Sequence, residues 1–388
     1  MSKIYYITQY FDIKSDKALG GILIRKKQIE LFKKNGLDLI IVMPDFSGSK
    51  VRVEDNIIYV PFFYQKQICD ILERTGLWPD QFYDFSLKAL KYLQSSVTKD
   101  DIIFCVTGGT LETIILGSKL KTITGCKFYI NFQDPINHTS VHGRYVDNSI
   151  RVKRDHLENK YIKNVDIIFT SSDTFRENLI NKYHFLSADN VINSYFGYVK
   201  EVPLVEKDSK DSKNITLMYS GVYGQHQQPE KFCKIFSALE NRYTLYFLGN
   251  HSQYEPIQKY LNDYEFVDFM PHDTFLKWVQ HNIDIGFVSL TSDYLSACVP
   301  SKIYEYINLN LPIIGFLPES DAKELVNKNG FGRIFNYNDE TGFADFVKNE
   351  LDNQFIEKCR VNIIAQREQW SMEHTFHDIL KFFENNNR

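Results

Sequence analysis

The sequence lacks several features that would place it in a common protein class at once. Its 388 residues contain no apolar run near the roughly 20 residues needed to cross a bilayer. A net charge of −4 gives no basic surface for nucleic acid. Only six residues are cysteine, and no two form the C-x-x-C spacing of a metal or redox site. The cysteines lie mostly in apolar runs, so we expect buried thiols in a reducing compartment.

The signatures of several enzyme classes are missing as well. The sequence contains no hydrolytic triad pattern and no P-loop. His138 and His142 lie four residues apart, but the third ligand and the glutamate of a zinc helix are lacking, so we expect no metal. A nicotinamide dehydrogenase is disfavoured, because neither half has a full G-x-G-x-x-G followed by a suitable acidic residue. The sequence starts directly with a strand pattern and no signal segment, which predicts a cytoplasmic protein.

What the sequence does contain is a regular alternation of short apolar runs and amphipathic stretches. Its length suits two domains of roughly 150–200 residues each. Repeated strand-helix units predict a parallel sheet covered by helices on both faces. In the first half, a helix is expected over Ile22–Asn35, ending at Gly36. The strands expected there are Lys3–Thr8, Leu37–Met43, Asp101–Val106, Lys127–Phe132 and Val165–Thr170.

The stretch Glu201–Asn214 is charged, contains serines and has no apolar period, so we interpret it as a linker. The alternation then restarts, and the strands expected are Ile215–Ser220, Thr244–Leu248, Phe266–Phe269, Ile283–Val288 and Pro312–Phe316. We therefore predict two Rossmann-like α/β domains, residues 1–200 and 215–370, whose sheets face each other across a cleft. Residues 371–388 are expected to form a C-terminal helix that returns toward the first domain.

One segment, Val299–Tyr306 with the sequence VPSKIYEY, combines the groups that a nucleoside diphosphate needs. Ser301 opens the expected helix, whose first-turn amides are unsatisfied and favour a phosphate. Lys302 adds a positive charge at that end. Glu305, one turn on, is a good acceptor for a sugar diol such as a pair of ribose hydroxyls. The same residues would also suit an ordinary surface helix with a lysine–glutamate pair, so chemistry alone leaves both interpretations open.

Pairs of glycines follow the first expected strand of each half. Gly221 and Gly224 lie where the phosphate loops of doubly wound sheets occur, and Gly20 and Gly21 occupy the equivalent junction of the first half. Either pair could border a ligand or simply form a turn. The helix after Gly21 carries cations that suit a solvated face or anionic membrane headgroups, and these are Arg25, Lys26, Lys27, Lys33 and Lys34.

Polar residues also follow the expected strand Lys127–Phe132. Asp134 lies at the end of that strand, and the loop after it contains His138, His142 and Arg144. Polar residues in a long loop after a strand are candidates for contact with a sugar or an acceptor.

In their order, these segments resemble a family 4 glycosyltransferase of the GT-B fold over nearly the whole chain. The opening KIYYITQYF…GGILIRKKQIELFKKNGLDLIIVMP is similar to the family's first strand, glycine loop, helix and second strand. The segments that follow in family order are YTLYFLGN, FVDFMPHDTFLKWVQHNIDIGFVSL, VPSKIYEYINLNLPIIGF, NGFGRIF and WSMEHTFHDILKFFEN. Single segments are weak signals, and the ordered series is the specific one.

The resemblance implies roles for several residues in one nucleotide-sugar site. Glu305 matches the second glutamate of the family's Glu-x7-Glu motif, which binds the donor ribose. Ser301 and Lys302 match positions that contact the diphosphate or donor sugar in the branch that reads P-S-K. The remaining matches are the phosphate loop (Gly221, Gly224), the base-reading main chain (Met270), the N-domain loop beside donor phosphate and acceptor (Gly20, Gly21) and a structural aspartate (Asp284).

Two features depart from the family pattern. The first glutamate of the motif falls on Ala297, and the usual Arg and Lys after the glycine loop correspond to Val222 and Gln227. The stabilisation of the leaving diphosphate is therefore expected from Lys302 and the helix amides. Further candidates for this role are Arg25, His226 and Arg144.

The activity that the resemblance implies is retaining transfer of a hexose or related sugar from a nucleoside diphosphate sugar, with a UDP-sugar favoured. The expected acceptor is a glycan or lipid-linked saccharide of cell-surface polysaccharide synthesis, with peripheral contact to the inner membrane face. No metal and no bound cofactor are expected, and Lys302, Asp134 and His138 are the catalytic candidates. Two alternatives stay open, a nucleotide-sugar 2-epimerase of the same fold and a non-catalytic nucleotide-sugar-binding partner subunit, which Val222 and Gln227 favour.

Overall fold

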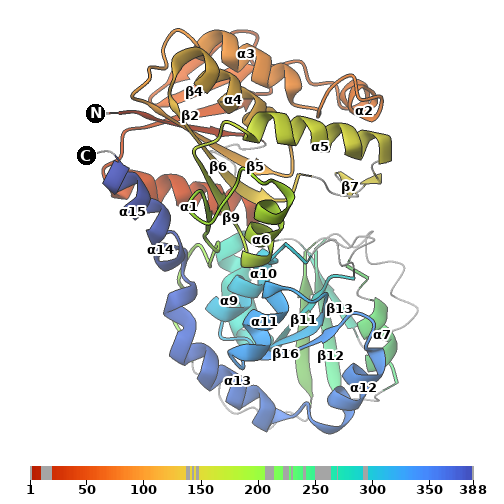
Figure 1. The fold of residues 1–388 in the computed structure, drawn as a ribbon. Coiled ribbons are helices and arrows are strands. Elements are labelled where there is room, and N and C mark those ends of the chain that lie inside the picture. The colour runs from red at the N-terminus through yellow and green to blue at the C-terminus, as the bar shows by residue number, and fades with distance from the viewer. Residues whose placement is uncertain are drawn as a thin grey trace. The chain divides into compact units, whose positions relative to one another are not determined.

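The chain folds into two compact α/β units (Figure 1). The computed structural model describes residues 2–9, 20–136, 140–141, 144–145, 148–205, 214–221, 227–228, 230–238, 242–249, 264–268, 270–291 and 296–386. The first unit includes Gly21–Tyr195 and, from the far end of the chain, Phe376–Arg388; the second includes Phe196–Thr375.

The first unit is built on an eight-stranded sheet in the order β10-β9-β6-β5-β1-β2-β4-β3. Its strands are β1 (Ile4–Thr8), β2 (Leu39–Asp45), β3 (Arg52–Glu54), β4 (Ile57–Pro61), β5 (Ile102–Gly108), β6 (Lys127–Asp134), β9 (Ile167–Thr170) and β10 (Val191–Asn193). Apart from the β3–β4 hairpin, every pair is parallel. Their continuous apolar runs suit strands that are covered on both faces. A short ribbon of β7 (Ser140–Val141) and β8 (Arg144–Tyr145) stands apart from this sheet.

Helices of the first unit include one from the end of the chain. Helix α15 (His377–Asn386) packs Phe383 against Phe32 of α1 (Gly20–Lys34) and against Phe104 of β5, with ring centroids 5.2 and 5.5 Å apart. This apolar contact explains why a C-terminal segment belongs to the N-terminal unit. The helices are α1 (Gly20–Lys34), α2 (Lys66–Arg74), α3 (Tyr83–Leu93), α4 (Glu112–Thr124), α5 (Asn148–Ile162), α6 (Asp173–Lys182) and α15 (His377–Asn386).

The second unit has a six-stranded, all-parallel sheet in the order β13-β12-β11-β14-β15-β16. Phe232, Phe287 and Phe316 lie in its buried core. Its strands are β11 (Ile215–Ser220), β12 (Tyr243–Leu248), β13 (Tyr264–Val267), β14 (Ile285–Ser289), β15 (Ile313–Leu317) and β16 (Gly332–Asn336). Its helices are α7 (Glu230–Phe236), α9 (His272–Asn282), α10 (Ser301–Asn308), α11 (Asp321–Lys328), α12 (Glu340–Asn349), α13 (Asn353–Gln366), the 3₁₀ turn Arg367–Trp370 and α14 (Met372–Thr375).

The predicted fold class is confirmed, since both units are parallel α/β sheets with Rossmann-type strand order. Gly36 ends α1 with a φ of +70°, as predicted for the glycine after a helix. Asp284 accepts hydrogen bonds from the amide and hydroxyl of Thr216, at 3.1 and 2.8 Å, and so ties β14 to β11.

Candidate functional site

The strand order of the second unit indicates where on its sheet a ligand would bind. The chain runs from β11 outward to β12 and β13, then returns to β14, which pairs with the other side of β11. Doubly wound sheets bind their ligands where the strand order reverses, at the carboxyl ends of the two central strands. Gly221 follows β11 directly, and the connection after β14 leads into α10. Of the predicted donor residues, Gly221 and the α10 residues Ser301, Lys302 and Glu305 therefore follow the two strands of the switch point.

Helix α10 is held against the sheet by its apolar face. Ile303, Tyr306 and Ile307 are buried. A side-chain carbon at Gly286 of β14 would lie only 2.4 Å from the Tyr306 ring, so glycine is what allows this close approach. Pro300 precedes the helix, and no side chain caps it. The amide of Ile303 donates to the carbonyl oxygen of Pro300, at 3.0 Å, so the amides of Ser301 and Lys302 are the ones that can face a ligand or solvent, on the side where Ser301 is exposed.

Lys302 reaches from the first turn of α10 to the end of β11. Its Nζ lies 4.1 Å from the centroid of the Tyr219 ring, a cation–π contact. It also lies 3.4 Å from where a side-chain carbon at Gly221 would be. Burial lowers the pKa of Lys302 to about 8, and Glu305 partly opposes this shift. An anionic ligand would stabilise the charged form of this desolvated ammonium group and raise its pKa again.

Gly221 needs to be glycine. Its φ of +118° is strained for any other residue, and the Lys302 ammonium group occupies the space beside it. Its amide donates to the carbonyl oxygen of Leu248, at 3.2 Å. The backbone here can therefore approach the lysine closely.

Glu305 has a partner that the sequence interpretation did not identify. Oε1 of Glu305 lies 2.6 Å from Nε2 of His272, the first residue of α9. The His272 ring also stacks on Phe275, with centroids 6.2 Å apart. Met270, the residue expected to read the base, comes two positions before His272. His272 could have been identified from the sequence, because it lies two positions from Met270 in a segment that resembles the family.

The remaining positions considered for the donor site contribute no charged side chain among the described residues. Ala297 is buried and brings no carboxylate to the site. Gln227 is half-buried. Gly224, His226 and Val222 lie outside the described residues.

In the first unit, Gly21, Arg25 and Asp134 gather at the carboxyl ends of β5 and β6. Nη2 of Arg25 and Oδ2 of Asp134 lie 3.4 and 3.7 Å from the position of a side-chain carbon on Gly108. Nη1 of Arg25 also lies 3.6 Å from the corresponding position on Gly21, so the guanidinium folds back toward the start of its own helix. Gln133 places its Oε1 4.0 Å from both positions.

Arg25 is buried, which corrects the prediction that it lies on a solvated or membrane-facing side of α1. The correction has a packing reason. The side chain turns inward among the ends of the central strands, where burial lowers its pKa, while Tyr6 and Asp134 counter that shift. Its buried Nε has no hydrogen-bond partner among the described residues. Lys33 and Lys34 are exposed at the end of α1, as expected for either solvated or membrane-facing residues.

The loop after β6 is only partly described. His138 and His142 lie outside the described residues. Arg144 lies in β8, but its side chain is not described, and Gly20 is the first residue of α1.

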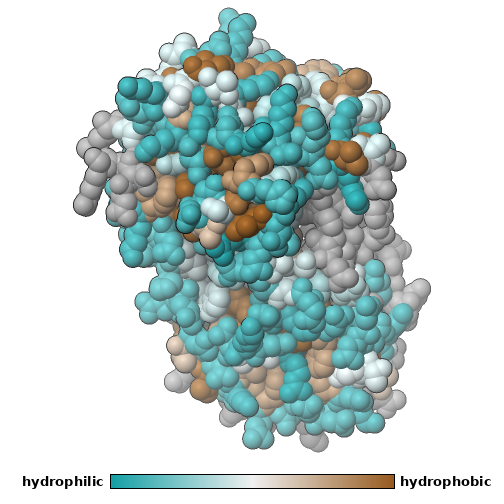
Figure 2. Space-filling model, in the orientation of Figure 1, coloured by the Kyte–Doolittle hydropathy of each residue, from teal (hydrophilic) through white to brown (hydrophobic). Residues whose placement is uncertain are grey.

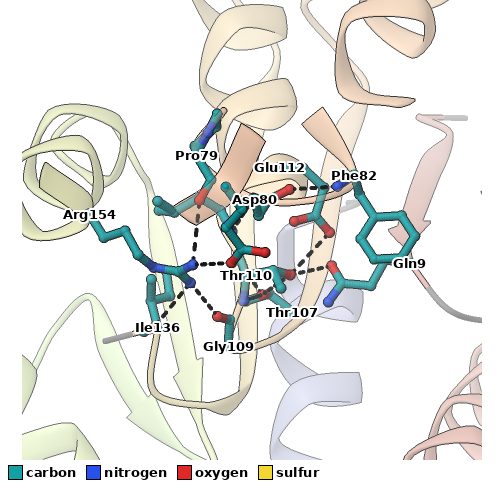
Figure 3. Close-up of polar contacts among 12 residues, drawn as sticks. Gln9, Pro79, Asp80, Phe82, Thr107, Gly109, Thr110, Glu112, Ile136 and Arg154 are labelled. Atoms are coloured by element: carbon teal, nitrogen blue, oxygen red, sulfur yellow. Dashed lines mark hydrogen bonds and ion pairs between the residues drawn. The ribbon is translucent and has the colours of Figure 1, made fainter. Parts of the chain in front are cut away.

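A cluster of buried acids, which the sequence did not predict, lies at the switch point of the first unit between β1 and β5 (Figure 3). Arg154 of α5 pairs with Glu73 at 3.0 Å and donates to the carbonyl oxygens of Gly109 and Ile136, at 2.8 and 3.2 Å. Asp80 accepts from the amides of Phe82 and Leu111, at 2.9 and 3.0 Å. Arg154 thus joins the loops that follow β5 and β6 to α2.

Burial also sets the protonation of these acids. It raises the pKa of Glu112 well above its ordinary value, with Asp80 adding to the shift, and raises the pKa of Glu73 to about 7 despite Arg154. Thr110 lies within hydrogen-bond distance of both Gln9 and Glu112, at 2.6 and 3.1 Å. Oε2 of Glu112 and Nε of Arg154 are buried without a hydrogen-bond partner among the described residues, while the other contacts of the cluster join its own side chains to the neighbouring loops. These contacts indicate that the cluster stabilises the loops.

The described part of the chain shows neither a group of metal ligands nor a membrane-spanning helix. Three or more His, Cys, Asp or Glu side chains that could hold a metal ion do not come together there. Neither does any described helix combine the length and apolar character needed to span a membrane.

Comparison with solved structures places the fold among glycosyltransferases. The chain is similar to Anabaena Alr3699/HepE in complex with UDP-glucose, with a TM-score of 0.68 and 12% identity over 99% of this chain and 100% of that one. It is also similar to the lipopolysaccharide outer core galactosyltransferase WaaB in its apo form, with a TM-score of 0.66 and 14% identity over 99% and 98% of the chains. A trehalose 6-phosphate synthase from Burkholderia multivorans gives a TM-score of 0.67 and 11% identity over 99% and 97%. The fold is thus of the GT-B type. No protein-family model matches the sequence, and no curated protein matches it.

Proposed function

We propose that this chain is a retaining, metal-independent glycosyltransferase of family 4 type that uses a nucleoside diphosphate sugar, with a UDP-sugar favoured. The observation that carries the proposal is the convergence of Lys302, Gly221 and Glu305 at the switch point of the second unit. Further support comes from the similarity in fold to a protein solved with UDP-glucose.

The proposed roles follow from the geometry of α10. The diphosphate binds at the first-turn amides, with the Lys302 ammonium group neutralising the charge that develops on the leaving phosphate. Glu305 accepts hydrogen bonds from the ribose hydroxyls, and His272, bonded to one carboxylate oxygen, fixes its orientation. Main-chain groups near Met270 read the base. The leaving phosphate oxygen takes the acceptor proton on the same face of the sugar, so the reaction needs no separate general base.

The acceptor side of the proposal rests on the first unit. Asp134 and Arg25, with Gly21, supply a carboxylate and a guanidinium for hydroxyl or phosphate groups of a sugar or acceptor. His138 and Arg144 are further candidates. The acceptor proposed is a glycan or lipid-linked saccharide of cell-surface polysaccharide synthesis, used at the cytoplasmic face of the membrane with peripheral membrane contact.

A second function, a non-catalytic nucleotide-sugar-binding subunit, is favoured by one observation. The position of the first motif glutamate holds the buried Ala297, so the sugar end of the site lacks that carboxylate. Such a protein would bind UDP and leave UDP-glucose intact.

The test is a thermal-shift screen against UDP-, GDP- and ADP-sugars, followed by an assay for UDP release. A ligand that binds only the folded chain raises the free energy of unfolding by about 2.7 kcal/mol when its concentration is 100 times its Kd. Stabilisation by UDP-sugars with slow UDP release supports the transferase. Stabilisation without release favours the subunit, and no stabilisation by any nucleotide sugar contradicts both.

A further inference from the structure

Helix α2 of the first unit buries an acidic residue and exposes apolar ones. The helix buries Glu73, which pairs with Arg154 at 3.0 Å, and also buries Cys69. Its isoleucines point the other way, so that Ile68 and Ile71 are 42% and 59% exposed. Burying the carboxylate and exposing the isoleucines runs against the usual distribution of these residue types. The Glu73–Arg154 ion pair holds the helix in this orientation.

The residues that flank α2 extend the apolar surface. Leu77 is 71% exposed, and Phe63 is also exposed. Phe63 packs edge-on against Trp78, with ring centroids 6.5 Å apart, which brings the two ends of the segment together. We call Phe63, Ile68, Ile71 and Leu77 the α2 apolar surface. Apolar residues gathered in this way within one segment mark a surface that contacts something.

The charges around this surface are mainly positive. Lys66 and Arg74 are exposed at the two ends of α2, and the exposed Lys153 of α5 donates from its Nζ to the carbonyl oxygen of Gly76, at 2.8 Å. Two half-buried acids also lie here: Asp70 of the same helix, and Asp84, whose carboxylate accepts a hydrogen bond from the amide of Phe63 at 2.6 Å. In Figure 2, brown and teal residues lie side by side at the upper right, where α2 lies in Figure 1. A protein with a net charge of −4 therefore carries a local group of cations around exposed apolar side chains.

We propose that the α2 apolar surface docks on an anionic lipid bilayer, with Ile71 and Leu77 entering the headgroup–acyl boundary and Lys66, Arg74 and Lys153 contacting lipid phosphates. Exposed apolar residues edged with Lys and Arg are the features that bind a protein to the plane of a membrane. The inference rests on the proposed function only for the expectation of membrane contact, and it moves that contact from the lysines of α1 to α2.

The experiment is co-sedimentation of the full chain with vesicles of phosphatidylcholine, alone or with about a quarter phosphatidylglycerol. We expect binding to the anionic vesicles and little to phosphatidylcholine alone. Ile71→Ser with Leu77→Ser should weaken binding by about tenfold or more, since each side chain loses its buried apolar area. Val361→Ser with Ile364→Ser on α13 is the matched control, because these residues are 64% and 51% exposed, and this pair should bind like the unaltered chain.

A second pair of variants tests the electrostatic contribution. Lys66→Gln with Arg74→Gln should weaken binding by about thirtyfold, because two cations near the anionic surface are lost. Lys33→Gln with Lys34→Gln, on α1, should leave binding unchanged. A larger loss from the α1 pair than from the α2 pair would overturn the proposed location. Equal binding to both kinds of vesicle would also overturn the proposal.

Sedimentation velocity and UDP binding distinguish membrane docking from the other ways in which this surface could be covered. A dimer in sedimentation velocity that Ile71→Ser with Leu77→Ser dissociates would show that a second copy covers the surface, and would contradict membrane docking. UDP binding is measured in parallel on every variant and is expected to stay unchanged. Vesicle binding by a chain that does not bind UDP would contradict the proposed function and leave the docking surface supported.

Discussion

The two units share one strand order but use their switch points differently. In the second unit the switch point presents a lysine with a lowered pKa, a half-buried glutamate and uncapped helix amides. In the first unit the corresponding position between β1 and β5 is filled by Gln9, Thr110 and Glu112, all buried and joined by hydrogen bonds. The same topology therefore provides a possible ligand site in both units, and the side chains at that position determine whether it can bind a ligand or instead stabilises loops.

The largest effect on stability should come from removing Arg154, the cation among the buried acids of the first unit. Arg154→Met leaves the acids near it without their cation, and we expect the free energy of unfolding to fall by about 3–5 kcal/mol. Urea denaturation followed by circular dichroism measures this loss, and UDP affinity should not change in the variant that remains folded. An unfolding free energy within error of the unaltered chain would contradict a stabilising role for the cluster.

The same cluster predicts a dependence of stability on pH. The folded-state pKa of Glu73, about 7, lies above its ordinary value of 4.5, so the folded chain binds the proton more tightly than the unfolded one. The resulting stability is present below pH 4.5 and is lost as the pH rises through about 7. Glu73→Gln should therefore flatten the stability profile between these values, as urea titrations at several pH values would measure. An unchanged slope would contradict the raised pKa.

In the second unit, Glu305→Ala should lower the affinity for UDP by about 100-fold, because a carboxylate that accepts two ribose hydroxyls is lost. Isothermal titration calorimetry measures this change. Glu324→Ala is the control, since Glu324 is an exposed acid that pairs with Lys328 on α11. Near-normal UDP binding by the Glu305 variant would contradict the assignment.

Lys302→Gln should lower UDP affinity by about tenfold to thirtyfold at pH 7. Lys302 is protonated below its pKa of about 8 and neutral above it, so the affinity of the unaltered chain should fall as the pH rises through and beyond 8. The bound diphosphate raises the pKa of the lysine, which places the inflection for the complex at a higher pH. The variant should show no such fall. A pH profile shared by both proteins would show that another group is responsible.

The smallest effect expected is that of His272→Phe, about threefold to tenfold in UDP affinity, because Glu305 loses one hydrogen bond that orients it. His281→Phe, at the other end of α9, serves as the control. Identical affinities for the two variants would show that His272 does not position Glu305.

The sequence predicted the fold well because buried parallel strands are continuous apolar runs bounded by glycines and charged turns. It did not predict β3 and β4. The edge strand β3 has the half-polar sequence RVE, which resembles a loop, and its neighbour β4 is an apolar run of only five residues, IIYVP. Lys302, Glu305 and Gly221 could be proposed from the sequence because they match motif positions in the ordered segments that resemble the family. The Glu305–His272 contact joins residues 33 positions apart, and the Glu73–Arg154 pair joins residues 81 apart. Such contacts depend on how helices pack, which local spacing does not encode.

The most direct test of the central claim is a crystal structure of the chain with UDP. We predict the diphosphate at the first turn of α10, within hydrogen-bond distance of Lys302 Nζ, and the ribose hydroxyls on the Glu305 carboxylate. UDP bound away from the β11–β14 switch point, with Lys302 and Glu305 untouched, would contradict the claim.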